Sequence, residues 1–209
     1  MNSKTICSTR YFIFLFAVLT GTKTYAQEEK EAEVTNVTKL TFLNPGLSQE
    51  LKIGKRQTVY AQLYLNTAAT ATTYYNNTQP SEIDFYFDPA ITVQFRHYYN
   101  GRQRGMKGKR TEMNSMNYVA AIAESFFSKI PMNNSIVQED RRPITTLGAA
   151  WGLQRNYKGR FSLDLYLGLG YRFANSTIYT IPQPTTVSTT EFTILSQINV
   201  GIWLNKKKQ

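Results

Sequence analysis

The stretch FSLDLYLGLGYRF, residues 161–173, decides the fold of this chain. Every second residue is large and apolar, and polar or small residues occupy the positions between. Successive side chains of a β-strand point to opposite faces, so this strict period of two predicts a strand with one apolar and one polar face. The apolar face comprises Phe161, Leu163, Leu165, Leu167, Leu169, Tyr171 and Phe173.

The same alternation recurs along the chain. It is clear in three more segments, weaker in two, and short near residue 50. An eighth strand is expected at 37–43, turned by Asn44-Pro45-Gly46, although 39–54 could instead be one continuous strand. The other predicted strands are 47–54, 58–74, 83–99, 117–129, 144–157, 160–174 and 190–204.

The connections between these strands differ in length. GKRQ (54–57) and YKGR (157–160) are typical of hairpin turns, and residues 100–115 form a longer basic connection. The other connections, rich in Asn, Thr, Ser and Pro, are expected at 76–82, 131–143 and 175–190. An up-and-down meander with short turns at one end and longer loops at the other is typical of outer-membrane barrels.

The N-terminus has the pattern of a secretory signal peptide. Lys4 and Arg10 precede an apolar run of about eleven residues, too short to span a bilayer, and Thr24-Tyr25-Ala26 supplies the cleavage site. Cys7 lies in this segment, so the mature chain is expected to have no thiol and no disulfide. We therefore expect a cleaved signal peptide at 1–26, a mobile acidic lead at 27–36, a barrel at 37–205 and a basic tail at 206–209.

A membrane explains the apolar faces better than a second protein layer does. A membrane-spanning strand needs about 9–11 residues, whereas ordinary strands average about five or six. The apolar faces persist through residues 83–95 and 161–173, and aromatic residues lie near the segment ends, where interfacial girdles are expected. Ten aromatic residues are expected in these girdles, Tyr98 and Trp203 among them.

The fold class predicted is therefore all-β, an up-and-down antiparallel transmembrane β-barrel of eight strands. Its lipid-facing residues include Leu163, Leu165, Leu167 and Leu169. The alternative from another class is a secreted soluble β-sandwich that binds glycans, in which the same alternation would separate a core from a wet surface.

Charged residues fall on the faces opposite the apolar ones. An eight-stranded barrel is only wide enough for its own side chains, and buried charges need partners, so we expect an ion-pair network in the lumen and no diffusion pore. The residues predicted for this network are Glu50, Arg96, Glu124, Asp164 and Arg172.

His97 is the only histidine. It has the same parity as Phe95 and Tyr99, meaning that it lies an even number of residues from them along the strand, so it points outward near the strand end. We interpret it as an interfacial residue. The alternative is an outer-membrane lipid-modifying enzyme with His97 as base, which would need a nearby serine such as Ser162 or Ser196. A multi-histidine metal site is excluded, and no catalytic residue, metal or cofactor is predicted.

Several segments resemble a known group of proteins. They are TYAQ (24–27), NPGLSQELKIGKRQT (44–58), FDPAITVQFRHYYNGRQRGMKGKRT (87–111), NSMNYVA (114–120) and AAWGLQRNYKGRFSLDLYLGLGY (149–171). Together they resemble the small outer-membrane β-barrel proteins that some Gram-negative bacteria encode in many poorly characterised copies. The resemblance implies an outer-membrane location, insertion by the outer-membrane assembly machinery, and a structural or surface-interaction role through extracellular loops.

Net charge limits the partners. The chain carries +10 formally, and an exported basic protein is expected to meet anionic lipids and lipopolysaccharide but no nucleic acid. Basic residues cluster at 102–110. We expect this cluster to be a solvated end of the barrel, with docking of an anionic periplasmic partner as the alternative.

Overall fold

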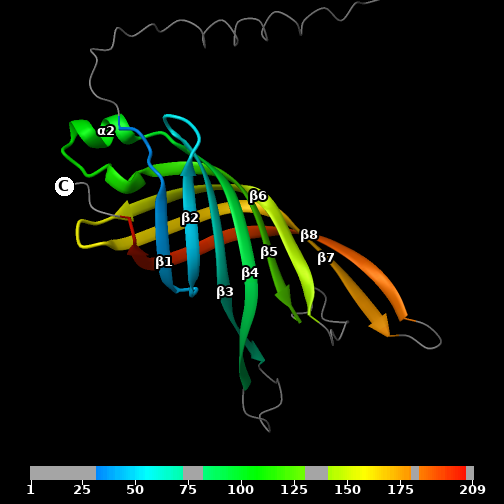
Figure 1. Cartoon of the computed structure of the whole chain (residues 1–209). Helices are drawn as coiled ribbons and strands as arrows, with labels where there is room; N and C mark the ends of the chain where they lie inside the picture. The colour runs from blue at the N-terminus through cyan, green and yellow to red at the C-terminus, as the bar shows by residue number, and fades with distance from the viewer. Residues whose placement is uncertain (1–31, 73–81, 130–140, 180–183, 206–209) are drawn as a thin grey trace, which may run out of the picture. The chain divides into compact units, whose positions relative to one another are not determined.

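Eight antiparallel β-strands pair in chain order, and the first also pairs with the last, so the sheet closes on itself (Figure 1). This computed structural model describes residues 32–72, 82–129, 141–179 and 184–205. The expected closed, eight-stranded, antiparallel sheet is confirmed. The strands are β1 (Val37–Leu43), β2 (Gly46–Lys52), β3 (Gln57–Thr72), β4 (Glu82–Tyr98), β5 (Asn117–Ser128), β6 (Arg142–Asn156), β7 (Phe161–Tyr179) and β8 (Pro184–Trp203).

The strand expected at 37–43 is present as β1. The prediction of a separate strand there is therefore confirmed, and the alternative of one continuous strand over 39–54 is wrong. Asn44 has a φ of 55°, a left-handed conformation that asparagine tolerates better than most residues. The Thr41 hydroxyl donates a hydrogen bond of 2.8 Å to the Asn44 carbonyl oxygen. This turn reverses the chain and pairs Thr41 with Gly46.

The predicted long loop at 175–190 is wrong, because β7 and β8 extend into this segment from both sides. Their pairing continues through Asn175 and Ser188 to Tyr179 and Pro184. The segment 185–190 contains four threonines and one valine, whose β-branched side chains favour strands. The expected loops at 76–82 and 131–143 lie mostly outside the described residues.

The basic connection between β4 and β5 contains short helices that the sequence did not predict. They are α2 (Gly101–Met106) and a 3-10 helix, η1 (Glu112–Asn114). The described residues contain no helix with the length and apolar character needed to cross a membrane.

The two faces of the closed sheet differ in polarity as the alternation predicts. Outside, Leu167 and Leu169 are 61% and 55% exposed, and Leu163 and Leu165 are half-buried on the same face. Inside, Gln62, Thr92 and Gln94 are almost fully buried. Tyr98 and Trp203, assigned above to an outer aromatic girdle, instead point inward and are buried, because each lies at an inward position of its alternating strand.

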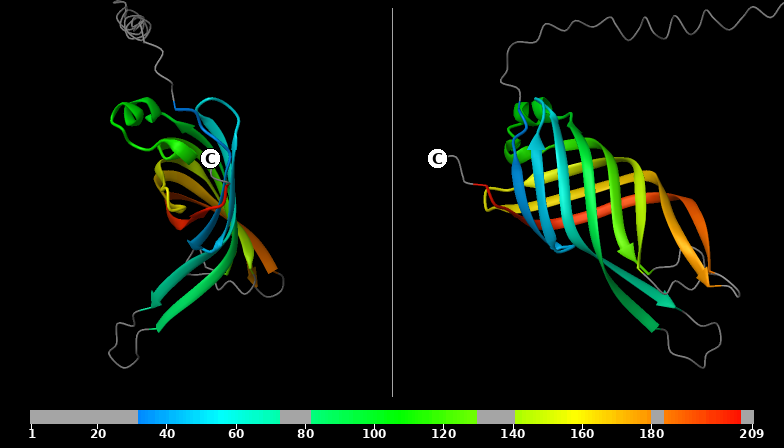
Figure 2. Two further views of the ribbon diagram at one scale, coloured as in Figure 1. Left: turned by 60° about the vertical axis from the view of Figure 1, so that its left-hand side comes forward. Right: turned by 45° about the vertical axis from the view of Figure 1, so that its right-hand side comes forward.

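One end of the closed sheet is covered by the chain itself, and we call it the capped end (Figure 2). The connections 53–56, 99–116 and 157–160 lie there, as do residues 32–36 and 204–205. Within residues 32–36, Val34 is fully buried, and its N–H donates to the Lys55 carbonyl oxygen at 3.1 Å.

Candidate functional site

The interior next to the capped end holds a network of paired charges centred on Asp164. Arg96 Nη1 lies 2.8 Å from Asp164 Oδ2, and the Tyr118 hydroxyl donates to Asp164 Oδ1 at 2.7 Å. Lys39 Nζ lies 3.5 Å from the same carboxylate. All four side chains are nearly inaccessible to solvent, so this one carboxylate balances much of the buried positive charge.

The Arg96 side chain is held between two aromatic rings. Its guanidinium carbon lies 3.8 Å from the centroid of Tyr60 and 4.3 Å from that of Tyr118. Arg96 Nε also donates to Gln94 Oε1 at 2.8 Å. Cation–π contacts strengthen when the cation is desolvated, so the two rings add to the electrostatic support of the buried arginine.

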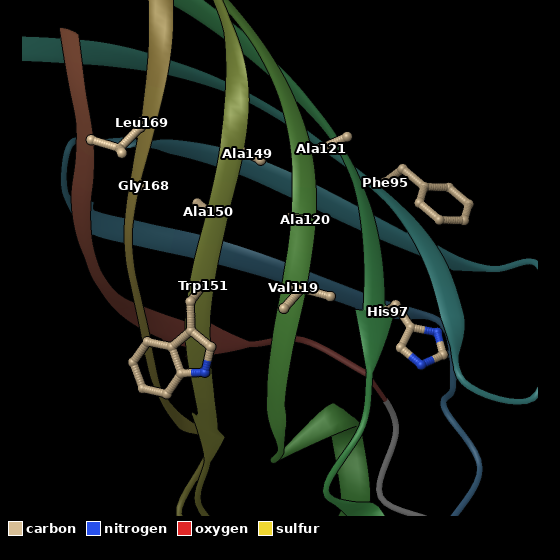
Figure 3. A pocket seen from close by; sticks show the side chains of 10 residues that line it. All are labelled: Phe95, His97, Val119, Ala120, Ala121, Ala149, Ala150, Trp151, Gly168 and Leu169. Carbon is tan, nitrogen blue, oxygen red and sulfur yellow. The ribbon is translucent and has the colours of Figure 1, made fainter. Parts of the chain in front are cut away.

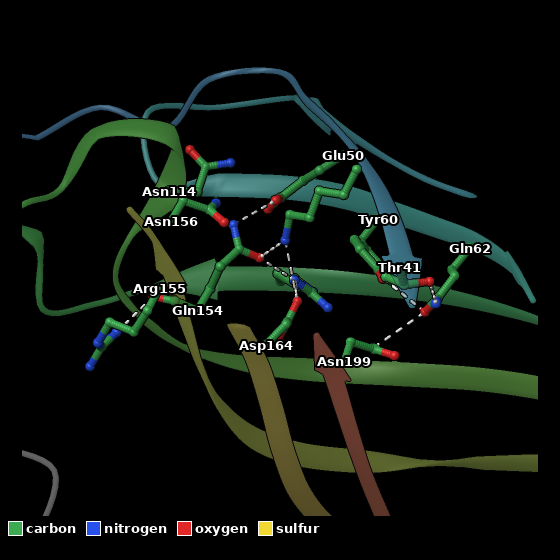
Figure 4. Close-up of polar contacts among 12 residues, drawn as sticks. Thr41, Glu50, Tyr60, Gln62, Asn114, Gln154, Arg155, Asn156, Asp164 and Asn199 are labelled. Carbon is green, nitrogen blue, oxygen red and sulfur yellow. Dashed lines mark hydrogen bonds and ion pairs between the residues drawn. The ribbon is translucent and has the colours of Figure 1, made fainter. Parts of the chain in front are cut away.

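Glu50 is the second buried acid, and Gln154 links it to the first. Thr58 and Tyr98 donate to Glu50 Oε1 at 2.7 and 2.6 Å. Gln154 Nε2 donates to Glu50 Oε2 at 3.2 Å, and Gln154 Oε1 accepts from Lys39 and Arg96 at 2.5 and 2.9 Å. Figure 4 shows Glu50, Gln154 and Asp164 converging. The two cations, Lys39 and Arg96, thus meet the two anions, Glu50 and Asp164. With all four side chains ionised, the net charge of the cluster is zero.

Strand register brings this network together. Inward positions of β1, β2, β4, β6 and β7 supply Lys39, Glu50, Arg96, Gln154 and Asp164. Arg96 pairs with Thr58 across β3 and β4, and Gln154 pairs with Asp164 across β6 and β7. Side chains of strands on opposite sides of the closed sheet then meet in the interior, which an eight-stranded closed sheet leaves just wide enough for side chains.

Two of the five predicted network residues lie in separate contacts. The Tyr166 hydroxyl lies 2.8 Å from Gln197 Oε1 and 3.2 Å from Glu124 Oε2, so its single O–H is shared between these two acceptors. Arg172 pairs with Glu191 at 3.1 Å, and both are about a third exposed. The parity of each residue places all five charged side chains inward. It does not give their relative heights inside the closed sheet, and therefore does not say which of them come into contact.

Sequence reasoning missed Lys39 and Gln154 as members of the network. The signal for Lys39 was present, because Leu40 and Phe42 are exposed outward residues of β1 and parity therefore points Lys39 inward. Gln154 carries no charge, and nothing in its sequence context indicates that its amide bridges two ion pairs.

The interior also contains two apolar clusters. One cluster contains Tyr166, Ile122 and Leu195. A second contains Tyr64, Ala90, Phe126, Ile144 and Ala174. Paired charges and packed apolar side chains together rigidify the interior of the closed sheet.

Residues Met113 and Asn114 close the capped end from within, and we call them the plug. Asn114 is fully buried; its Oδ1 accepts from the Thr35 N–H at 2.7 Å, and its Nδ2 donates to the Thr35 carbonyl oxygen at 2.8 Å. The Met113 carbonyl oxygen accepts from Gln154 Nε2 at 3.3 Å and from Asn156 Nδ2. The plug therefore ties the N-terminal segment and the β4–β5 connection to the charged network.

His97 lies on the outside, as parity predicts, half-buried and 3.1 Å from Gln57 Nε2 through its Nδ1. Its strand pairs only with β3 and β5. Ser162 is on β7 and points inward, and Ser196 is on β8. Neither serine lies on a strand next to His97, and the described residues contain no group of three or more potential metal ligands.

Comparison with known proteins places the chain in a family. Searches of curated proteins and of solved structures found no match. A family model described as "Protein of unknown function (DUF3575)" matches residues 12–202, which includes every strand except the last residue of β8. The chain therefore belongs to the family described as "Protein of unknown function (DUF3575)".

Proposed function

We propose that this chain is a non-enzymatic outer-membrane β-barrel protein with a structural or surface-interaction role. One observation carries the proposal: the closed sheet is apolar on its outside and polar, with paired charges, on much of its inside. A water-soluble protein has the opposite arrangement, whereas a membrane barrel turns its apolar residues toward lipid.

The height of the apolar surface supports a bilayer. The apolar face of β7 runs without interruption from Phe161 to Phe173. Twelve residue steps of about 3.3 Å, tilted by roughly 40°, span about 30 Å. This height is close to the apolar band of about 25 Å on outer-membrane barrels and to a hydrocarbon core of roughly 30 Å.

The amount of exposed apolar surface argues against a soluble sandwich. Large apolar side chains are exposed on the outside of every strand, and soluble monomers rarely expose contiguous apolar patches above a few hundred Å². A sandwich would cover such a face with a second sheet, but the strands here form one closed sheet.

The filled interior supports a role other than diffusion. The charged network, the plug and the apolar clusters occupy the inside of the closed sheet. The protein would therefore act through its ends and its outer surface, surrounded by outer-membrane lipid and lipopolysaccharide. Insertion would depend on the outer-membrane assembly machinery, with β8 as the last strand.

The decisive experiment places a charge on the outer face at two heights. Leu167 is at the middle of the apolar face, where an arginine facing lipid costs about 2–4 kcal/mol, falling to about 0–1 kcal/mol near the interface. We expect Leu167→Arg to impair folding into lipid vesicles and Asn175→Arg, an exposed outward position beyond the apolar face, to have little effect.

Folding would be followed by the heat-modifiable mobility of the protein on gels, and location by membrane fractionation of expressing cells. If wild-type protein stays folded and soluble without detergent or lipid, or if the two arginine variants fold equally well, the proposal fails.

A further inference from the structure

The outer face of the closed sheet has a groove across β5 and β6. Pairing aligns Phe95, Ala121, Ala149 and Leu169 in one row, so two alanines lie between two bulky residues. In the next row Val119 lies between His97 and Trp151. The low alanine side chains form the floor and the bulky ones the walls, and these residues line a single pocket (Figure 3).

The wall of this groove nearest the capped end is fixed by a hydrogen bond between aromatic side chains. Trp151 Nε1 donates to the Tyr99 hydroxyl at 2.6 Å, and both side chains are close to half exposed. Tyrosine and tryptophan favour the membrane interface, where the ring contacts apolar groups and the polar atom reaches the headgroups. The groove therefore runs from the interface toward the middle of the apolar face.

Two arginines lie beyond the groove at the capped end. Arg155 is an outward, half-buried residue of β6, opposite Leu163 of the apolar face. Arg104 of α2 is linked to it through Asn100: the Arg104 backbone N–H donates to the Asn100 carbonyl oxygen at 3.0 Å, and Asn100 Oδ1 accepts from the N–H of Asn117, whose side chain contacts Arg155. Each guanidinium group is hydrogen-bonded only to uncharged oxygens: Arg155 to the Gln154 carbonyl and the Asn117 amide, and Arg104 to the Arg110 carbonyl.

No acid among the described residues compensates this pair of charges with an ion pair. Glu112, the acid of the same connection, pairs instead with Arg110 at 2.7 Å. Like charges held together beside an apolar surface are unfavourable unless an anion lies between them. A phosphate accepts bidentate hydrogen bonds from arginine, and each guanidinium group has further N–H donors to offer.

We propose that the groove and the Arg104–Arg155 pair form one binding site for an anionic phospholipid. The phosphate lies between the two guanidinium groups, and an acyl chain lies on Ala121 and Ala149 against Trp151. This inference rests on the proposed membrane location, since only a membrane protein would meet lipid on this face. The lipid belongs to the leaflet that surrounds the capped end.

Quenching of tryptophan fluorescence by brominated lipids tests the site directly. The chain has two tryptophans; Trp151 is 46% exposed on the outer face, whereas Trp203 is 2% exposed in the interior. The mature protein would be folded into phosphatidylcholine vesicles that contain increasing brominated phosphatidylglycerol or brominated phosphatidylcholine. Trp151→Phe supplies the background signal.

We expect brominated phosphatidylglycerol to quench Trp151 preferentially. Each basic side chain near an anionic membrane contributes roughly 1 kcal/mol, so the preference should be about fivefold per arginine. Arg104→Gln with Arg155→Gln should remove it, and the matched pair Lys107→Gln with Lys158→Gln, two exposed lysines of the capped end whose charges are screened by solvent, should lower it much less. Ala149→Leu keeps both arginines but fills the groove, and it should also lower the preference.

The outcomes separate this inference from the proposed function. Equal quenching by both lipids in the wild type, a preference that survives in Arg104→Gln/Arg155→Gln, or loss of the preference in millimolar inorganic phosphate would each overturn the phospholipid site while leaving the membrane location intact. If neither brominated lipid quenches Trp151, the protein is not inserted in the bilayer, and the proposed function fails as well.

Discussion

Replacing Asp164 by asparagine tests whether the buried charge network stabilises the fold. The change removes one negative charge but preserves side-chain shape, and it leaves Lys39 and Arg96 facing Glu50 alone. Asp164 receives contacts of 2.8 Å from Arg96, 2.7 Å from Tyr118 and 3.5 Å from Lys39. Breaking a buried ion pair by removing one partner typically costs about 3–5 kcal/mol, and we expect Asp164→Asn to lower the free energy of unfolding by this amount.

A second substitution separates uncompensated charge from simple loss of contacts. Arg96→Met with Asp164→Leu removes one cation and one anion, and the methionine can still pack between the Tyr60 and Tyr118 rings. Apolar replacement of a whole buried pair is often neutral. We therefore expect the double variant to be more stable than Asp164→Asn, although it contains more changes.

The assay is urea unfolding of the protein in detergent micelles, followed by heat-modifiable gel mobility. Glu191→Gln is the matched control, because the Arg172–Glu191 pair is about a third exposed and such pairs contribute about 0–1 kcal/mol. The reasoning is refuted if Asp164→Asn costs no more than Glu191→Gln, or if the double variant is less stable than the single one.

Two further predictions concern the capped end. Asn114 has a φ of 58° and makes two hydrogen bonds with the Thr35 backbone, each worth about 0.5–1.5 kcal/mol net. Asn114→Ala should speed hydrogen exchange of the Thr35 amide more than Asn114→Gly, which avoids the strain of a left-handed residue; equal effects would contradict this account. The Lys52 ammonium, 2.6 Å from Glu33, lowers the pKa of the Glu33 carboxyl below its usual 4.5. The contact is therefore complete above the ordinary glutamate pKa and lost as pH falls through the lowered value, and NMR titration should show a higher Glu33 pKa in Lys52→Met than in the wild type.

The sequence by itself determined the strands and which face each residue occupies. A period of two depends only on local backbone geometry, so Leu167 outward and Glu50, Arg96 and Asp164 inward could be read from the alternation. The turn at Asn44-Pro45-Gly46 was also readable, because those residues favour reversal of the chain. The extension of β7 and β8 was missed, since a polar, threonine-rich segment looks like a loop when its pairing partner is unknown.

Only the tertiary structure decided which inward side chains meet. Glu124 and Asp164 have the same parity, yet Asp164 joins Arg96 and Lys39 while Glu124 contacts Tyr166. Contacts across the interior depend on the stagger between strands that are not neighbours, which closure of the sheet sets and no local pattern encodes. For the same reason the plug at Asn114 and the groove between Ala121 and Ala149 became visible only when distant segments were placed side by side.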